Sequence, residues 1–177
     1  MTIYISLLRG VNVGGRKIIM NELKKLYESL KFSDVKTYIQ SGNVIFKSSN
    51  NSSKELEEMI ENRIRDVFDL HIPIFIRTTN EFESIINNNP FPREDPKKIY
   101  VTFLRDTPVS TDLKEINMIK DESEKFLLND KELYLLLPHG YGRTRLSNNL
   151  IEKKLHVLTT TRNWRTVNKL YELAPNN

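Results

Sequence analysis

The chain has 177 residues, enough for one large domain or two small, intimately packed domains whose cores need no cross-links. It contains no cysteine, which excludes a disulfide framework, a thiolate metal site and a cysteine nucleophile. Its formal net charge is +4, and basic residues concentrate in residues 1–20 and 138–177, which favours an anionic ligand, although uneven charge is also a common aid to solubility.

The spacing of apolar residues predicts a βαββαβ order in the first part of the chain. We expect a strand at 3–8, a helix at 21–30, strands at 35–39 and 43–47, a long helix from Ser52 or Ser53 to near residue 70, and a strand at 72–78. Residues 40–42 form a tight turn between the two middle strands. This order is the split pattern of a ferredoxin-like domain, an antiparallel sheet with two helices on one face.

A second, shorter version of the same plan follows. A helix at 81–87 and the loop NNNPFPREDP separate the halves, which predicts subdomains at 1–79 and 98–177 joined by residues 80–97. The second half is expected to contain a strand at 98–104, a helix at 111–120, strands at 125–128 and 132–137, and two terminal helices. That βαββα order lacks the last strand of the ferredoxin-like plan.

The segment 9–17 lies between the first strand and the first helix and is rich in glycine. Gly10, Gly14 and Gly15 let its backbone turn so that amides face a bound anion, and Arg9, Arg16 and Lys17 supply positive charge. The segment is not a P-loop, because Arg16 stands where that pattern needs lysine. A turn that only reverses the chain is the alternative interpretation.

The segment PHGYGRTRLSN holds the other basic loop. Ser147 is placed as an N-cap and Leu146 with Ile151 as a hydrophobic staple, so a helix should begin at Asn148 with its free amides directed at Arg143 and Arg145. Each favourable charge there contributes about 0.3 to 1 kcal/mol, so micromolar binding needs several converging donors. Two solvated loop arginines explain the pattern equally well.

The last segment, Thr159 to Leu173, is predicted to be a helix capped by its threonine run. Trp164, Val167, Leu170, Tyr171 and Ala174 share an apolar face, which favours a core role for the tryptophan. The opposite face carries Arg162, Arg165 and Lys169. That basic face would contact phosphates or simply be solvated.

The turn at Gln40, Ser41 and Asn43 lies where a ferredoxin-like sheet would bring it near residues 9–17. Ser41 is a weak candidate for a nucleophile, since it lacks a GxSxG context and the sequence assigns it no base. The histidines, at 71, 139 and 156, have no metal-ligand spacing, so we expect neither a metal nor another cofactor.

The N-terminus MTIYISLLRG lacks the charged start and long apolar stretch of a signal peptide. No apolar run approaches the roughly 20 residues of a membrane span. We therefore expect a soluble, cytoplasmic protein with no membrane partner.

Three ordered motifs carry a family resemblance: LLRGVNVGGRKIIMNEL, VKTYIQSGNVIF, and RLSNNLIEKKL followed by TTRNWRTVNKL. Over nearly the whole chain they resemble the bacterial family known as domain of unknown function 1697. The resemblance implies an α+β fold of two interlocked ferredoxin-like subdomains and brings no established activity, cofactor or catalytic residue. Its motif positions are occupied here by Arg9, Gly10, Asn12, Gly14, Gly15, Ser41, Gly42, Asn43, Leu146, Arg162, Asn163 and Trp164. Lys31 and His156 stand where members often have glycine, so two helices must end without it.

Three functions remain open from the sequence. The first is a binding module for a nucleotide, a nucleic acid or another phosphate-bearing ligand, with Arg9, Gly10, Asn12, Gly14, Gly15, Arg16, Lys17, Ser41, Asn43, Arg143, Arg145, Asn148 and Arg162 as the candidate site. The second is a transferase or hydrolase acting on a phosphorylated small molecule, with Ser41 or His139 moving protons. The third is a scaffold or oligomer that pairs through an exposed sheet edge.

Overall fold

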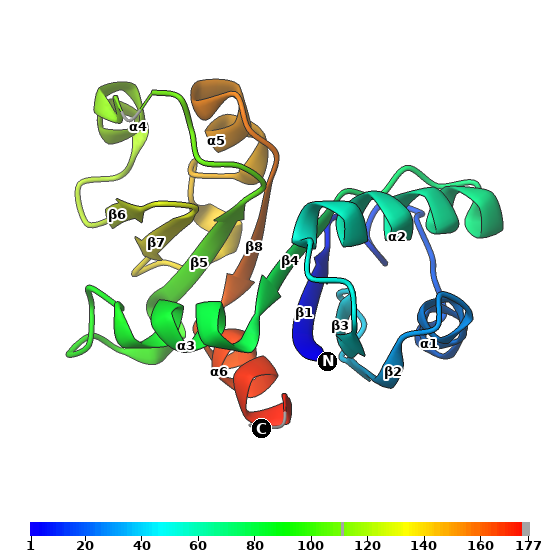
Figure 1. Ribbon diagram of the computed structural model, residues 1–177. Coiled ribbons are helices and arrows are strands. Elements are labelled where there is room, and N and C mark those ends of the chain that lie inside the picture. Colours follow the sequence, from blue (N-terminus) through cyan, green and yellow to red (C-terminus); the bar gives the residue numbers. More distant parts are fainter. Residues whose placement is uncertain (111, 175–177) are drawn as a thin grey trace. The chain divides into compact units, whose positions relative to one another are not determined.

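The computed structural model describes residues 1–110 and 112–174, which form an α+β structure with two four-stranded antiparallel sheets (Figure 1). The elements of the first half are β1 (Thr2–Leu8), α1 (Met20–Ser29), β2 (Ser33–Tyr38), β3 (Asn43–Ser48), α2 (Ser53–Phe68), β4 (Ile74–Thr78) and α3 (Thr79–Asn87). Those of the second half are β5 (Ile99–Leu104), α4 (Lys114–Ile119), β6 (Lys125–Asn129), β7 (Glu132–Leu136), α5 (Asn148–Leu155), β8 (Thr159–Asn163) and α6 (Trp164–Leu173), with single 3₁₀ turns at Pro96–Lys98 and Tyr141–Arg143. The chain divides into two compact units, one of Met1–Glu83 with the residues from Lys169 onward, the other of Ser84–Asn168.

The sheet of the first unit has the strand order β2-β3-β1-β4, which is the ferredoxin-like order. The apolar positions expected to face the core are buried at Leu23, Leu26 and Tyr27 on α1 and at Leu56, Ile60 and Ile64 on α2. The stripe expected on α2 also included Met59 and Val67, which are 40% and 49% exposed. Ser52 caps α2 by accepting the N–H of Glu55 at 3.3 Å.

The second unit repeats this plan with the order β6-β7-β5-β8. Helix α5 begins at Asn148 as predicted, and the hydroxyl of Ser147 accepts the N–H of Leu150 at 3.2 Å. Leu146 and Ile151 are both completely buried in the same core cluster, which confirms the predicted staple. The predicted start of α4 at residue 111 lies outside the described residues.

The expectation of an incomplete second copy was wrong. The segment Thr159–Asn163 is not a helix cap but strand β8, which pairs antiparallel with β5 and completes the βαββαβ plan. Threonine is β-branched and favours strands, so the run TTT has the propensity of the structure it adopts. The predicted basic helix face is therefore divided. Arg162 lies on strand β8, whereas Arg165, which is exposed, and Lys169, which is partly exposed, lie on α6. Val167, Leu170 and Ala174 are buried as predicted, whereas Trp164 and Tyr171 are only partly buried.

The correspondence between the units extends to individual hydrogen bonds. The N–H that follows the first strand donates to the residue before the last strand in both units, from Arg9 to Pro73 O at 3.1 Å and from Arg105 to Leu158 O at 2.9 Å. A helix glutamate accepts the first N–H of the last strand in both, Glu61 from Ile74 at 2.9 Å and Glu152 from Thr159 at 2.8 Å. The two units are therefore repeats of one structural design.

Candidate functional site

The glycine-rich segment of the first unit forms a small hairpin between β1 and α1. The N–H of Asn12 donates to Arg16 O at 2.7 Å, and the N–H of Arg16 donates to Val13 O at 3.3 Å. Gly14 and Gly15, at the tip, have φ of 58° and 89°, and these two positive values define a type I′ turn. Nothing lies within 4 Å of a Cβ placed on either glycine, so the tip is open to solvent.

The side chain of Asn12 fixes the base of this hairpin. Its Nδ2 donates to Ile18 O at 3.2 Å and to Gln40 O at 2.6 Å, and its Oδ1 accepts the N–H of Ile18 at 2.9 Å. Both amide hydrogens are thus used within the protein. Asn12 therefore shapes the segment and joins it to the turn between β2 and β3.

That turn packs directly against the start of the hairpin. The N–H of Leu8 donates to Gly42 O at 2.8 Å, and a Cβ on Gly42 would lie only 2.8 Å from Leu8 Cβ and 3.3 Å from Val11 Cβ. Buried Asn43 donates from Nδ2 to Tyr38 O and to Ser41 Oγ, both at 3.0 Å. The structure thus brings together the first two glycine segments, with Asn43 and Ser41 bonded to each other inside the turn.

A shallow depression of about 510 Å³ lies where these parts meet the start of α1. It is lined by Asn12, Lys17, Ile18, Ile19, Met20, Asn21 and Gln40. Arg16 and Lys17 are exposed beside it, and a Cβ on Gly10 would lie 3.7 Å from Arg16 Nη1, which places the guanidinium over the start of the loop. Arg9 is partly buried at the other end of the segment.

Sequence reasoning left five of the residues that line this depression out of the candidate site: Ile18, Ile19, Met20, Asn21 and Gln40, although Gln40 was placed in the turn expected near residues 9–17. One further signal concerns Ile19. Ile19 is the N-cap of α1 and makes no side-chain capping bond, whereas Ser, Thr, Asp and Asn are the preferred residues at this position.

Exposed aliphatic side chains surround the same part of the unit. Val13 is 60% exposed, Ile19 62% and Ile39 48%. Ile39 also has a φ of 50°, a left-handed conformation that is strained for a β-branched residue. The turn that carries Ser41 is therefore held in a conformation that its own sequence disfavours.

The basic segment of the second unit has a different character. Arg143 and Arg145 are exposed on the loop before α5. Asn148 is engaged within the unit, because its Oδ1 accepts the hydroxyls of Thr159 at 3.1 Å and Thr161 at 2.8 Å. Of the polar groups predicted here, the two arginines are the ones that face solvent.

Arg162 is buried on β8 with 8% of its surface exposed. Its Nη1 donates to Thr160 Oγ1 at 2.9 Å and to Thr161 O at 3.0 Å. Burial lowers the pKa of this guanidinium to about 10, and the electrostatic interaction with Tyr141 partly opposes this shift. These contacts give Arg162 a place in the interior, in contrast to Arg143 and Arg145.

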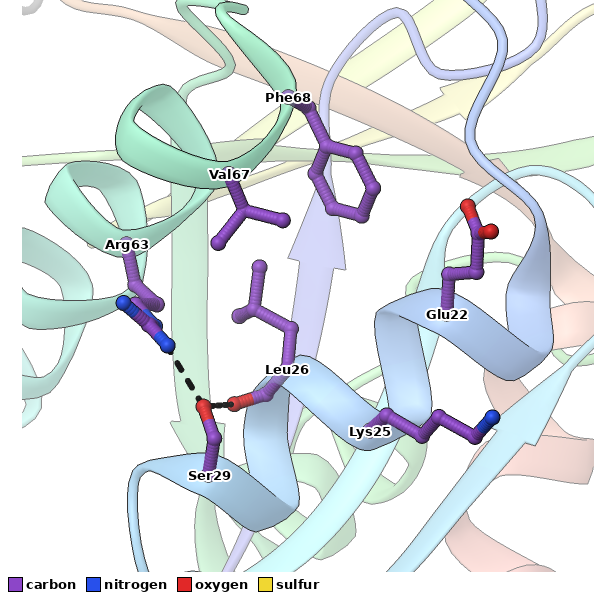
Figure 2. A pocket seen from close by; sticks show the side chains of 7 residues that line it. All are labelled: Glu22, Lys25, Leu26, Ser29, Arg63, Val67 and Phe68. Atoms are coloured by element: carbon purple, nitrogen blue, oxygen red, sulfur yellow. Dashed lines mark hydrogen bonds between the residues drawn. The ribbon is translucent and has the colours of Figure 1, made fainter.

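A second depression, of about 520 Å³, lies between α1 and α2 (Figure 2). Figure 2 shows that its lining combines the apolar side chains of Leu26, Val67 and Phe68 with the charged side chains of Glu22, Lys25 and Arg63. Arg63 Nε donates to Ser29 Oγ at 3.4 Å, and Ser29 Oγ donates to Leu26 O at 2.7 Å. None of the candidate site residues named from the sequence lines this groove, and its charged lining residues are of both signs.

Two further properties bear on the class of protein. Among the described residues, no group of three or more His, Asp or Glu side chains is arranged to hold a metal ion. In the same part of the chain, no helix is long and apolar enough to cross a membrane.

The fold and the site together define a protein of two ferredoxin-like units, one of which displays a basic, glycine-tipped hairpin. The chain belongs to the family described as "protein of unknown function (DUF1697)", whose model matches residues 1–134. A conserved bacterial protein from Streptococcus pneumoniae has the same fold, with a TM-score of 0.75 and 23% sequence identity over 97% of this chain and 98% of that one. No curated protein matches the sequence.

Proposed function

We propose that this protein binds a phosphate-bearing ligand, with nucleic acid as the favoured class, through the hairpin that ends in Arg16 and Lys17. The observation that carries the proposal is the combination of two exposed cations with a fixed backbone. The Asn12 side chain ties the base of the hairpin to Ile18 and Gln40, so the cations project from an anchored turn. A preorganised basic loop loses little conformational entropy on binding.

The shape of the site favours an extended ligand over a small metabolite. Small-molecule sites usually enclose most of their ligand, whereas the depression beside Lys17 is shallow and open. A nucleic-acid backbone presents phosphates in a row and needs no enclosing pocket. Gly14 and Gly15 add to this fit, because they leave the tip without side chains that would keep a phosphate away from the backbone.

Fluorescence anisotropy with labelled RNA and DNA oligonucleotides, each titrated at several salt concentrations, tests the proposal. Each lost phosphate contact reduces the slope of log K against log salt by about 0.7 to 0.9. The double variant Arg16→Ala with Lys17→Ala should therefore weaken binding and flatten the slope by about 1.5. Nucleotides and sugar phosphates are measured as competitors in the same assay.

A matched control removes the same charge from the same unit. Lys54 and Arg65 are exposed on α2, so replacing both with alanine changes the net charge equally without touching the hairpin. Retained affinity in this control, with loss in the hairpin variant, supports the proposal. Equal losses in the two variants would show that only net charge matters and would overturn it. Arg143→Ala with Arg145→Ala reports separately on the basic segment of the second unit.

A further inference from the structure

The edge strands of the two sheets differ in how well they are protected against pairing with another strand. An edge strand presents unpaired N–H and C=O groups, which invite pairing with another strand unless they are capped, distorted or covered. The edge strands are β2 and β4 in the first sheet and β6 and β8 in the second. Three of these four carry an evident protection.

Strand β4 is capped by carboxylates along its whole outer edge. The bond from Arg9 N to Pro73 O shows that odd-numbered residues of this strand face β1, so residues 74, 76 and 78 face outward. Their N–H groups donate to Glu61 at 2.9 Å, Glu57 at 2.9 Å and Glu81 at 2.6 Å. On β8, Glu152 accepts the N–H of Thr159 in the same manner.

Strand β2 is protected by distortion. Its pairing with β3 shifts register between Ser33 and Lys36, and Asp34 between them has a φ of 52°. Asp34 also forms an ion pair with Lys47 at 2.7 Å, and the side chain of Lys36 is exposed. A bulge and charged side chains are the usual means of blocking an edge.

Strand β6, which lies at the outer end of the second sheet (Figure 1), has neither a carboxylate cap nor a bulge among the described residues, and its one charged side chain, Lys125, stands at its start. Its sequence KFLLN contains no proline or glycine, and its register with β7 runs unbroken from Lys125 opposite Leu136 to Asn129 opposite Glu132. Leu127 is 43% exposed at its centre, on the face opposite the one that Phe126 packs against the core. An exposed, regular and apolar edge of this kind is typical of a strand that pairs.

The backbone groups available on β6 can be identified from the neighbouring strands. The bonds from Leu104 N to Lys131 O and from Leu137 N to Lys98 O show that odd-numbered residues of β7 face β5. Its even-numbered residues therefore bond to Lys125, Leu127 and Asn129. The N–H and C=O groups of Phe126 and Leu128 point away from the sheet, and no hydrogen bond among the described residues engages them.

We infer that β6 pairs antiparallel with β6 of a second copy of this chain, joining two four-stranded sheets into one continuous sheet. With a two-fold axis at Leu127, Phe126 of one copy lies opposite Leu128 of the other, and these residues exchange four hydrogen bonds. Leu127 of one copy then lies opposite Leu127 of the other, as a non-hydrogen-bonded pair with closely spaced side chains.

The sequence of β6 is complementary to itself in this register. Lys125 lies opposite Asn129, so cations do not meet, and the central leucines bury each other's exposed surface. Glu124, which precedes the strand, does not interfere, because it is 4% exposed and its carboxylate accepts the N–H of Asp121 at 3.1 Å. A second copy is therefore a better occupant than an unrelated strand of arbitrary charge.

Sedimentation velocity at concentrations from about 10 μM to about 1 mM covers the affinity expected of such a small interface. The full chain should move from monomer to dimer over this range. Leu127→Glu places two like charges opposite each other and should remain monomeric. Leu127→Val keeps the position apolar and introduces a β-branched side chain that favours strands, so this variant should still dimerise.

Amide hydrogen exchange locates the contact and keeps the test independent of folding. The amides of Phe126 and Leu128 should become protected as the concentration of the unsubstituted protein rises, and should exchange fast in Leu127→Glu. The amide of Leu133, which bonds within the sheet, should stay protected in every variant. A monomer at every concentration, or a dimer that survives in Leu127→Glu with fast exchange at these two amides, would overturn the proposal.

Discussion

The carboxylate of Glu57 accepts the backbone N–H of Ile76 at 2.9 Å, and both residues are buried. A glutamate in the interior is expensive unless its oxygens are hydrogen-bonded, and here it satisfies an edge N–H that would otherwise have no partner in the sheet. The same arrangement recurs one helical turn later, where Glu61 accepts the N–H of Ile74. An acidic run on a helix is usually a solvated face, but Glu57 and Glu61 of α2 instead cap the outer edge of β4.

This relationship predicts that Glu57→Ala lowers the free energy of unfolding by about 1 to 3 kcal/mol, the cost of leaving a buried N–H unsatisfied. Glu57→Gln keeps an acceptor oxygen and should lose less. Glu58→Ala, an exposed neighbour on the same helix, should change stability by no more than about 0.5 kcal/mol. Urea unfolding of the three variants measures the effect, and equal values for Glu57→Ala and Glu58→Ala would contradict it.

The two glycine segments give a second prediction, which separates a tight contact from an open turn. Gly42→Ala combines a φ of 77° with a Cβ placed 2.8 Å from Leu8 Cβ, so strain and overpacking together should cost about 2 to 4 kcal/mol. Gly14→Ala also has a positive φ, but its Cβ meets nothing within 4 Å, and it should cost only about 1 kcal/mol.

Thermal unfolding followed by circular dichroism compares these two variants directly. A difference of about 1 kcal/mol corresponds to roughly 2 to 4 °C in a chain of this length. If Gly14→Ala proved as damaging as Gly42→Ala, the hairpin tip would be packed rather than open, and the proposed approach of a ligand to its backbone would fail.

Much of the fold follows from local patterns in the sequence, while the missed features depend on distant residues. Capping by Ser52 and Ser147 is local, and these predictions were confirmed. The apolar stripes of α1 and α2 are also local, and most of their residues are buried as expected, but Met59 and Val67 on α2 are exposed. Strand β8 was missed because TTT beside a helical pattern reads as a cap as readily as a strand, and pairing with β5 decides between them.

The candidate site shows the same limit. Glycine and arginine mark its loops, but the sequence does not reveal that the Asn12 side chain is used up by Ile18 and Gln40, or that Arg162 is buried. Both residues have the polarity of ligand-binding groups, and only their three-dimensional surroundings assign them to internal hydrogen bonds. Arg16 and Lys17 remain exposed, and they now carry the binding proposal.

The third prediction concerns alkaline pH. Burial raises the pKa of Tyr27, and a 2.8 Å hydrogen bond with Ser6 opposes the rise only in part. The folded state therefore keeps this phenolic proton at pH values where the unfolded chain, with an ordinary tyrosine pKa of about 10, loses it. The stabilisation is fully present below about pH 10 and is lost as the pH rises above that value.

Urea unfolding between about pH 8 and pH 11 tests this dependence. Tyr27→Phe should be less stable than the original chain near neutral pH by about 0.5 to 1.5 kcal/mol, because Ser6 loses its partner. Above about pH 10 its stability should fall less steeply. Burial also raises the pKa of Tyr134, and its hydroxyl donates to Ile85 O at 2.8 Å. Tyr134→Phe should therefore show the same two effects, a lower stability near neutral pH and a less steep loss of stability at alkaline pH. An unchanged alkaline slope in Tyr27→Phe would show that its ionisation is not linked to unfolding.

The last prediction uses the two helix ends that lack the glycine expected there. Lys31 and His156 have φ of 64° and 56°, so both keep the left-handed conformation that glycine adopts without strain. His156 is exposed and closes α5 through the bond from its N–H to Glu152 O at 2.8 Å, which uses only the backbone. His156→Gly should therefore keep this bond, relieve the left-handed strain and raise the free energy of unfolding by about 0.5 to 1 kcal/mol. Lys31→Gly should act in the same direction, since Lys31 is also exposed and its N–H donates to Glu28 O at 3.0 Å.

His71→Gly is the matched control, because His71 is an exposed histidine outside the left-handed region, where glycine only adds freedom to the unfolded chain and should destabilise slightly. Chemical unfolding of the three variants gives opposite signs for His156→Gly and His71→Gly if backbone strain decides the outcome, and the same sign if it does not.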